Sequence, residues 1–365
     1  MNSALKLLSQ WLAANQYSFA FVNSTLNVFY LSNFYCQPHE RLLGLLVFPS
    51  GEPVLVCPLM EVARAKSEGW TYEIIGYNDS EDPWQKIAAI VGDRVGPEPV
   101  IAVEKEQLPL FRAEALQKTF PGCRFSAVEA KLRELRNIKS DGEVQVLREA
   151  AALADKAVEI GVAALAEGKT EMEVVAEIEY NMKKLGVARM SFPTMVLFGA
   201  KSAESHGSPG DTRLQAGDLV LFDLGVVHKG YCSDITRTFA FKSITPEFEK
   251  IYEITLKANE AAIAASAPGV RVGDIDKAAR EVITAAGYGE YFTHRVGHGL
   301  GIDVHEYPSM NGENDDLLAL GMAYTIEPGI YLPGRGGVRI EDDVVITADG
   351  CETLTKFPKH LQIIG

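Results

Sequence analysis

Four acidic residues in the second half of the sequence stand where apolar runs predict strands. Asp223 and Asp234 lie on either side of one short turn, and Glu327 and Glu341 lie on either side of a second, glycine-rich turn. An ionised carboxylate in such a run is costly unless a positive charge lies beside it. Because neighbouring carboxylates also repel one another, the repeated pairs predict a duplicated half-site that two divalent cations neutralise.

Four histidines accompany these acids. His294, His298 and His305 lie between the two acidic pairs, interleaved with glycines that let the backbone approach a ligand closely, and His206 lies in a polar loop before them. Imidazole binds metals and carries protons near neutral pH. One such histidine is more often structural, but four of them beside four acids favour a metal-dependent site.

The order and spacing of these residues resemble the pita-bread metallopeptidases, which include proline-specific peptidases and methionine aminopeptidases. The prolidase branch is the most similar. The resemblance rests on six segments near the acids and histidines: Phe-Asp-Leu-Gly, Ser-Asp-Ile-Thr-Arg-Thr, Gly-His-Gly-Leu-Gly, Val-His-Glu-Tyr-Pro, Glu-Pro-Gly-Ile-Tyr and Val-Arg-Ile-Glu-Asp-Asp. The segments Pro-His-Glu-Arg-Leu and Leu-Arg-Asn-Ile-Lys-Ser extend it over nearly the whole chain.

The resemblance implies five ligands for two divalent metal ions. Asp223 would bind the first ion, Asp234 and Glu341 would bridge both, and His298 and Glu327 would complete the second. Oxygen-rich ligation with one imidazole suits Mn²⁺ or Co²⁺, and Zn²⁺ less clearly.

The resemblance also implies catalytic roles. A hydroxide that bridges the metals would attack the scissile carbonyl, and Glu327 would carry its proton towards the leaving nitrogen. His206 and His305 would hold the carbonyl oxygen, and His294 resembles a further site histidine. Arg339 stands two residues before Glu341, so both would face one side of a strand, where the arginine would orient a carboxylate ligand.

The resemblance implies proline-containing dipeptides or short peptides as substrates. An X-Pro bond has no N–H, so a site that needs no hydrogen-bond donor at that position would favour it. Arg295 is the first candidate to bind the free carboxylate of a dipeptide, and Arg335 is the second. Ser309 stands where some prolidases carry arginine, which weakens the dipeptide assignment. His39, in the charged segment 38–41, is either solvated or reaches a site in another domain or subunit.

Several alternatives stay open. An Xaa-Pro aminopeptidase acting on longer peptides would have the same metal core. Methionine aminopeptidases usually lack a large first domain. Metal-free creatinase-like hydrolases and non-catalytic binding modules normally lose metal ligands, whereas all five are present here. The sequence therefore predicts an enzyme, a metallopeptidase, and favours the Xaa-Pro dipeptidase.

The predicted fold class is α/β (α+β), with two domains. An N-terminal mixed α/β domain of the creatinase and prolidase type would occupy residues 1–130, and a C-terminal pita-bread domain with duplicated halves would occupy residues 131–365. Apolar runs predict first-domain strands at 19–22, 28–31, 42–48, 54–57, 72–77 and 100–103, with helices at 62–68, 83–91 and 108–120. Ser140 with Glu143, and Thr170 with Glu173, have the spacing of capping boxes and predict two helix starts.

The net charge and the cysteine content exclude some classes of partner and location. A net charge of −14 argues against a nucleic acid or an anionic membrane as a partner. The five cysteines are widely spread, which fits reduced thiols in a cytoplasmic protein. No apolar run reaches membrane-spanning length. The resemblance further implies a homodimer.

Overall fold

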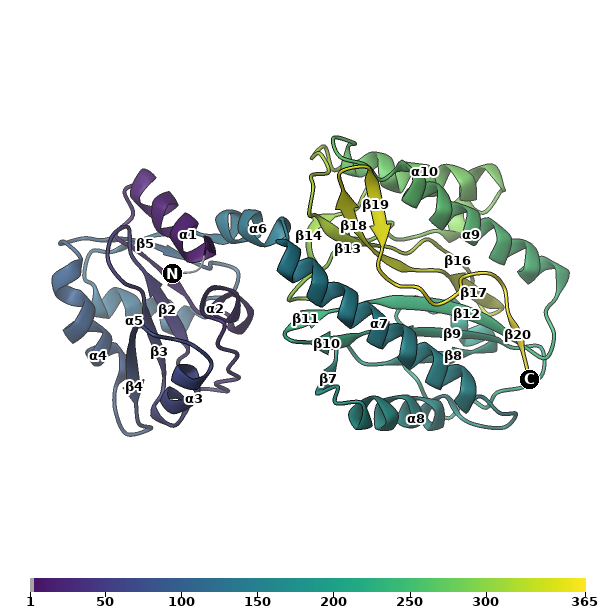
Figure 1. Cartoon of the computed structure of the whole chain (residues 1–365), viewed down its shortest axis with the longest axis horizontal. Coiled ribbons are helices and arrows are strands. Elements are labelled where there is room, and N and C mark those ends of the chain that lie inside the picture. Colours follow the sequence, from purple (N-terminus) through teal and green to yellow (C-terminus); the bar gives the residue numbers. More distant parts are fainter. Residues whose placement is uncertain (1–2) are drawn as a thin grey trace. The chain divides into compact units, whose positions relative to one another are not determined.

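The chain forms two compact units, Met1–Leu135 and Arg136–Gly365, and the computed structural model describes residues 3–365 of it. The sequence placed the domain boundary after residue 130, whereas the division in the structure falls inside helix α6, Glu129–Asn137. Figure 1 colours the first unit purple to blue and the second teal to yellow.

Unit 1 is built on a six-stranded mixed sheet in the order β4-β3-β2-β1-β5-β6. Its inner strands are continuous apolar runs because both faces of the sheet are covered there: Ala20 and Val22 face one core, and Phe19 and Phe21 face the other. The strands are β1 (Phe19–Val22), β2 (Gly44–Val47), β3 (Val54–Pro58), β4 (Glu73–Tyr77), β5 (Val100–Val103) and β6 (Arg124–Ala127). The helices are α1 (Ser3–Ala14), α2 (Thr25–Ser32), η1 (Leu59–Glu61), α3 (Val62–Ser67), α4 (Pro83–Val91), η2 (Gly92–Arg94) and α5 (Leu110–Thr119).

One predicted strand of this unit is wrong. The run 28–31 lies in helix α2, which begins after Ser24, whose hydroxyl accepts a hydrogen bond from the Asn27 amide as an N-cap. Ser24 is itself held by Glu104, which accepts hydrogen bonds from its amide and its hydroxyl. Such a short apolar run does not distinguish a strand from a buried helix turn, and the distant Glu104 favours the helix.

Unit 2 has the duplicated halves that the sequence predicts. Each half places a pair of helices against a sheet, and Figure 1 shows α7 beside β9, β10 and β12, and α9 beside the yellow strands. The sheets have the orders β20-β12-β9-β8 and β14-β13-β15-β18-β19. The helices are α7 (Asp141–Ala164), α8 (Glu171–Lys184), η3 (Gly199–Ala203), α9 (Pro246–Ala265), α10 (Val272–Ala285) and η4 (Gly289–Tyr291). The larger sheets contain β8 (Met195–Phe198), β9 (Leu219–Leu224), β12 (Ile235–Phe241), β13 (His298–Gly299), β14 (Glu306–Ser309), β15 (Ala323–Ile326), β18 (Asp342–Thr347), β19 (Gly350–Thr353) and β20 (Ile363–Ile364).

Smaller strand groups complete the unit. A three-stranded sheet joins β7 (Arg189–Met190), β10 (Val226–His228) and β11 (Tyr231–Cys232), and β16 (Gly329–Leu332) pairs with β17 (Gly336–Arg339). Both predicted capping boxes are confirmed, at Ser140 with Glu143 and at Thr170 with Glu173. Within residues 3–365, no helix combines the length and the apolar character that crossing a membrane requires.

The two halves meet along β12. The Glu341 amide donates a hydrogen bond to the Thr236 carbonyl at 3.1 Å, and the Thr238 hydroxyl donates to the Arg339 carbonyl at 2.9 Å. The spacing of Arg339 and Glu341 predicts that both lie on one strand, but the structure divides this segment: β17, which ends at Arg339, pairs with β16, whereas β18, which begins at Asp342, pairs with β15. Glu341 lies between β17 and β18, and its side chain accepts a hydrogen bond from Thr236 on β12, in the other half of the unit.

Candidate metal centre

The first acidic pair is placed by the antiparallel strands β9 and β12. Asp223 lies on β9 opposite Thr236, and Asp234 stands directly before β12. Their side chains are 14% and 6% exposed. The turn between them is long enough to form β10 and β11 and returns Asp234 to the end of the strand that carries Asp223.

The second half supplies the remaining predicted ligands. His298 opens β13, Glu327 follows β15 directly, and Glu341 lies between β17 and β18. The Thr325 hydroxyl accepts a hydrogen bond from the His298 amide at 3.1 Å, which fixes the start of β13 beside β15. The duplicated strand pairs therefore bring both acidic pairs to one place.

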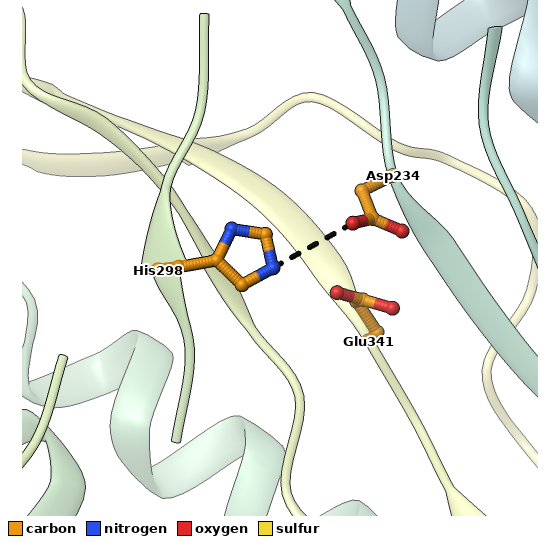
Figure 2. A group of neighbouring side chains, drawn as sticks. All are labelled: Asp234, His298 and Glu341. Carbon is orange, nitrogen blue, oxygen red and sulfur yellow. Dashed lines mark ion pairs between the residues drawn. The ribbon is translucent and has the colours of Figure 1, made fainter. Parts of the chain in front are cut away.

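Ligand atoms of Asp234, His298 and Glu341 all lie within 4.8 Å of one another. Figure 2 shows the His298 ring pointing towards the two carboxylates. His298 Nε2 lies 3.7 Å from Asp234 Oδ2 and 3.5 Å from Glu327 Oε1. We call these four residues, together with Asp223, the acidic cluster.

The protonation equilibria of the acidic cluster reflect burial and crowding. Burial, followed by the charges of Glu341 and Asp223, holds the pKa of Asp234 well above its usual range, and burial with Glu327 and Asp223 does the same for Glu341. Burial raises the pKa of Glu327 to about 8, although Arg339 opposes the shift. Burial also lowers the pKa of His298 to about 3. In the metal-free protein, protons on the carboxyl groups thus offset part of the negative charge of the acidic cluster. The His298 imidazole is neutral, as a metal ligand must be.

The residues fit a divalent metal. Asp223 Oδ1 and Asp234 Oδ1 are buried and make no hydrogen bond within the described residues. A buried carboxylate oxygen without a donor is costly, and a cation would satisfy both. Carboxylate oxygens with one imidazole suit Mn²⁺ and Co²⁺ better than the sulfur-rich ligands of structural zinc sites would.

Metal binding should therefore release protons. Because the pKa of Glu327 is raised to about 8 from 4.5, the metal-free native state binds protons that the unfolded chain has lost, and its stability should fall as the pH rises between these values. Metal affinity should rise over the same range, by about tenfold per pH unit for each proton displaced. Calorimetric titration with Mn²⁺ in two buffers of different ionisation enthalpy measures this release, and equal heats would contradict it.

Arg339 and Thr236 connect the ligands to one another. Arg339 Nη2 donates to Asp223 Oδ2 at 2.5 Å, and its Nε donates to the Thr236 hydroxyl at 3.0 Å. That hydroxyl donates in turn to Glu341 Oε2 at 2.6 Å. Sequence reasoning proposed Arg339 but missed Thr236, although it stands two residues after Asp234 within a quoted motif.

Tyr331 is a second residue that sequence reasoning missed. Its buried hydroxyl accepts a hydrogen bond from Arg339 Nη1 and lies 2.9 Å from His294 Nε2. His294 Nδ1 lies 2.7 Å from the Arg295 carbonyl, which can only accept, so Nδ1 carries the proton. Burial lowers the pKa of His294 to about 4, and the neutral ring then accepts from Tyr331 through Nε2. Both nitrogens are engaged by the protein, which distinguishes His294 from the other two candidate catalytic histidines.

His305 and His206 are more open. The His305 ring lies against the His298 ring, with a centroid distance of 4.1 Å, and is exposed at the edge of the acidic cluster. His206 is also exposed, and its charge contributes to the lowered pKa of His305, after burial and Arg295. These two histidines have ring nitrogens that a substrate could reach.

The candidate substrate-binding residues fall in different places. Arg295 Nη1 donates to the Ser309 hydroxyl at 2.9 Å, and the arginine lines a cleft of about 850 Å³ along α10. Arg335, in the β16–β17 turn, is half exposed and pairs with Glu247, so the structure gives it a surface ion pair instead of a contact with the acidic cluster. His39 lies in unit 1, in a left-handed conformation with φ 55°. Its predicted role in a neighbouring site stays a prediction.

Known proteins match the chain along its whole length. Residues 145–348 match the model of metallopeptidase family M24, and residues 5–138 match the creatinase/prolidase N-terminal domain. The protein "Putative dipeptidase YkvY" from Bacillus subtilis (strain 168) is 55% identical, over 99% of both chains. The prolidase structure from Pyrococcus horikoshii OT3 is 35% identical with a TM-score of 0.90, covering 98% of this chain and 99% of that one. An X-Pro aminopeptidase from Thermotoga maritima MSB8 is 29% identical with a TM-score of 0.87, covering 96% and 99%.

The fold and the site thus define a metallopeptidase. The chain belongs to metallopeptidase family M24 and carries the creatinase/prolidase N-terminal domain before its pita-bread unit. The predicted family, fold class and enzyme class are confirmed.

Proposed function

We propose that this enzyme hydrolyses the X-Pro bond of dipeptides with two divalent cations held by the acidic cluster. The observation that carries the proposal is that buried carboxylates meet a neutral imidazole in one place. Two of the carboxylate oxygens have no hydrogen-bond donor among the described residues. Asp223, Asp234 and Glu341, with His298 and Glu327, are the proposed ligands. The relatives named as a dipeptidase and a prolidase support the substrate class.

Bound Mn²⁺ or Co²⁺ would supply Lewis-acid activation of water and of the scissile carbonyl at this site. The side chains of the chain itself would do the rest. Glu327, whose proton metal binding would displace, would then be a carboxylate 3.5 Å from His298 Nε2, able to accept a proton from the attacking water and pass it to the leaving nitrogen. His305 and His206, both exposed beside the acidic cluster, would donate hydrogen bonds to the carbonyl oxygen as negative charge develops on it.

Arg295 is the proposed partner of the free carboxylate of a dipeptide. Within residues 3–365 it forms no ion pair with an aspartate or glutamate, and Ser309 holds only its Nη1. Its charge also opposes the burial-raised pKa of Glu327, so it lies close to the reacting groups. An unpaired guanidinium at the edge of a cleft suits a planar carboxylate.

Replacing Arg295 with Met should therefore lower kcat/KM for an Xaa-Pro dipeptide by about 10- to 100-fold, since a hydrogen bond to a charged group contributes about 1.5–3 kcal/mol. A tripeptide Xaa-Pro-Xaa, whose carboxylate lies one residue further on, should lose less. Steady-state kinetics on both peptides, with Arg335→Met as the matched arginine control, separates these effects. Equal losses on both peptides would remove Arg295 from carboxylate recognition.

The second candidate function is that of an Xaa-Pro aminopeptidase. The Thermotoga maritima relative, which has that activity in its name, favours this candidate. A length series from Xaa-Pro to longer peptides, assayed with added Mn²⁺, decides between the two. Dipeptides cleaved best support the proposal, whereas tripeptides and longer peptides cleaved best support the aminopeptidase.

A homodimer and a cytoplasmic location are proposed on the resemblance alone. In a dimer, the segment 38–41 with His39 would be a candidate contribution to the site of a partner subunit. Sedimentation analysis of the wild-type protein tests the dimer, and steady-state kinetics of His39→Ala tests the contribution of His39. A monomer at assay concentration would exclude this contribution, and so would an unchanged KM in the variant.

A further inference from the structure

Three charged side chains are buried together outside the acidic cluster. Glu306 opens β14, Arg136 lies in the last turn of α6, and Lys139 stands just before α7. Their side chains are 5%, 15% and 1% exposed. Arg136 Nη2 donates to Glu306 Oε1 at 2.5 Å, and Lys139 Nζ lies 3.6 Å from Oε2. The role of this buried charged triad is not explained by the proposed chemistry.

The Glu306 carboxylate shapes the turn that precedes it. The Asp303 amide donates to Glu306 Oε1 at 2.9 Å, and the Gly301 amide donates to the Asp303 carbonyl at 3.1 Å. A Cβ atom at Gly301 would lie 2.8 Å from both carboxylate oxygens, so only glycine lets the carboxylate sit there. The carboxylate thus holds residues 301–306, which we call the His305 turn.

The His305 turn carries two groups that the proposed reaction needs. His305 lies on it, with its ring 4.1 Å from that of His298. The Val304 main chain hydrogen-bonds the His298 ring, a contact that opposes the burial-lowered pKa of this imidazole. A hydrogen bond to a backbone carbonyl fixes the orientation of a metal-binding histidine. The position of the turn therefore sets both histidines.

The two cations keep the triad in one arrangement. Burial by itself would raise the pKa of Glu306, but Lys139 and Arg136 hold it below its ordinary value. Arg136 and the Asp303 amide both donate to Glu306 Oε1, whereas Lys139 makes no hydrogen bond within the described residues and acts on the carboxylate through its charge. Moving the carboxylate would break both hydrogen bonds and weaken the buried Arg136 ion pair. The triad is thus a rigid support under the His305 turn.

We propose that Glu306, held by Arg136 and Lys139, is a positioning residue that sets His305 for the reaction. The inference rests on the proposed function, because it assigns His305 a role in hydrolysis. Glu306 itself touches neither the substrate nor the metals. It acts through the turn, so at saturating metal its contribution to turnover should depend on His305, whereas any effect through His298 would appear in the affinity for Mn²⁺ instead.

The test is a double-mutant cycle of Glu306→Gln with His305→Ala, measured on an Xaa-Pro dipeptide at saturating Mn²⁺. Loss of such a supporting partner costs about 10- to 100-fold, and we expect this in kcat with KM nearly unchanged. In the His305→Ala background, Glu306→Gln should have less than one third of that effect on a logarithmic scale. Glu352→Gln, which breaks the surface pair with Arg148, is the matched control and should keep full activity.

Two results would overturn the inference: a Glu306→Gln enzyme as active as wild type, or losses that add fully in the double variant. If Glu306→Gln does not fold, Arg136→Lys keeps the charge while changing the donor geometry, and the same cycle with it decides. A wild-type protein that hydrolyses no Xaa-Pro peptide with metal would defeat the proposed function instead, so the two failures are distinguishable.

Discussion

Replacing Asp234 with Asn should lower kcat/KM on an Xaa-Pro dipeptide by on the order of 10³-fold or more, and should reduce bound metal. Asp234 lies within 4.8 Å of ligand atoms on His298 and Glu341, and its Oδ1 is buried without a donor. An amide has nearly the same shape but lacks the charge that binds a dication. The loss corresponds to about 4 kcal/mol of transition-state stabilisation.

The matched control is Asp315→Asn, because the Asp315 side chain is 87% exposed and pairs only with the surface residue Arg271 among the described residues. This variant should keep its metal and its activity. Steady-state kinetics together with metal analysis of both purified variants provides the measurement. An Asp234→Asn enzyme with wild-type turnover would show that the acidic cluster is not the catalytic site.

Replacing Arg237 with Met should lower the free energy of unfolding by about 3 kcal/mol, the lower end of the cost of removing one partner from a buried ion pair, because Lys359 stays paired with Asp342 at 2.9 Å. Arg237 is 1% exposed, and its Nη2 donates to Asp342 Oδ1 at 2.7 Å. It also donates to the carbonyls of Thr236 and Glu341, which tie β12 to the break between β17 and β18. The substitution removes all of these contacts at once.

Thermal and denaturant unfolding of the metal-free protein measures this loss. Arg335→Met breaks a half-exposed arginine pair in the same unit and should change the stability by no more than about 1 kcal/mol. Equal effects of the two substitutions would mean that burial does not strengthen the Arg237 pair. Such a result would also remove Arg237 as the link between the two halves of unit 2.

The sequence signals that predict the acidic cluster are local. Asp223 and Glu327 stand at the ends of apolar runs, and their partners Asp234 and Glu341 follow a single turn later. A strand ladder converts such spacing directly into proximity. The duplicated fold could therefore be predicted from the sequence, and the structure brings the two acidic pairs together.

Contacts between distant segments could not be predicted in the same way. The hydroxyl of Tyr331 meets His294 and Arg339, and Arg237 meets Asp342, only after both halves of unit 2 have folded. The apolar run 28–31 lies in helix α2 because Ser24 caps the start of this helix and is held by Glu104, far along the chain. These polar contacts join residues that lie close together only in the folded chain, and no fixed sequence spacing predicts them.

The same limit applies to substrate recognition. Arg295 and Arg335 were equal in residue type, and only the fold showed that one lines the cleft whereas the other pairs with Glu247 at the surface. The triad under the His305 turn was likewise hidden, because Arg136 and Lys139 precede Glu306 by more than half of unit 2.

The most direct test of the central claim is a titration of chelator-treated protein with Mn²⁺, following Xaa-Pro dipeptide hydrolysis and bound metal together. Hydrolysis should be absent without metal and should return as two ions bind to each chain. Undiminished hydrolysis in protein shown by elemental analysis to hold no metal would contradict the account.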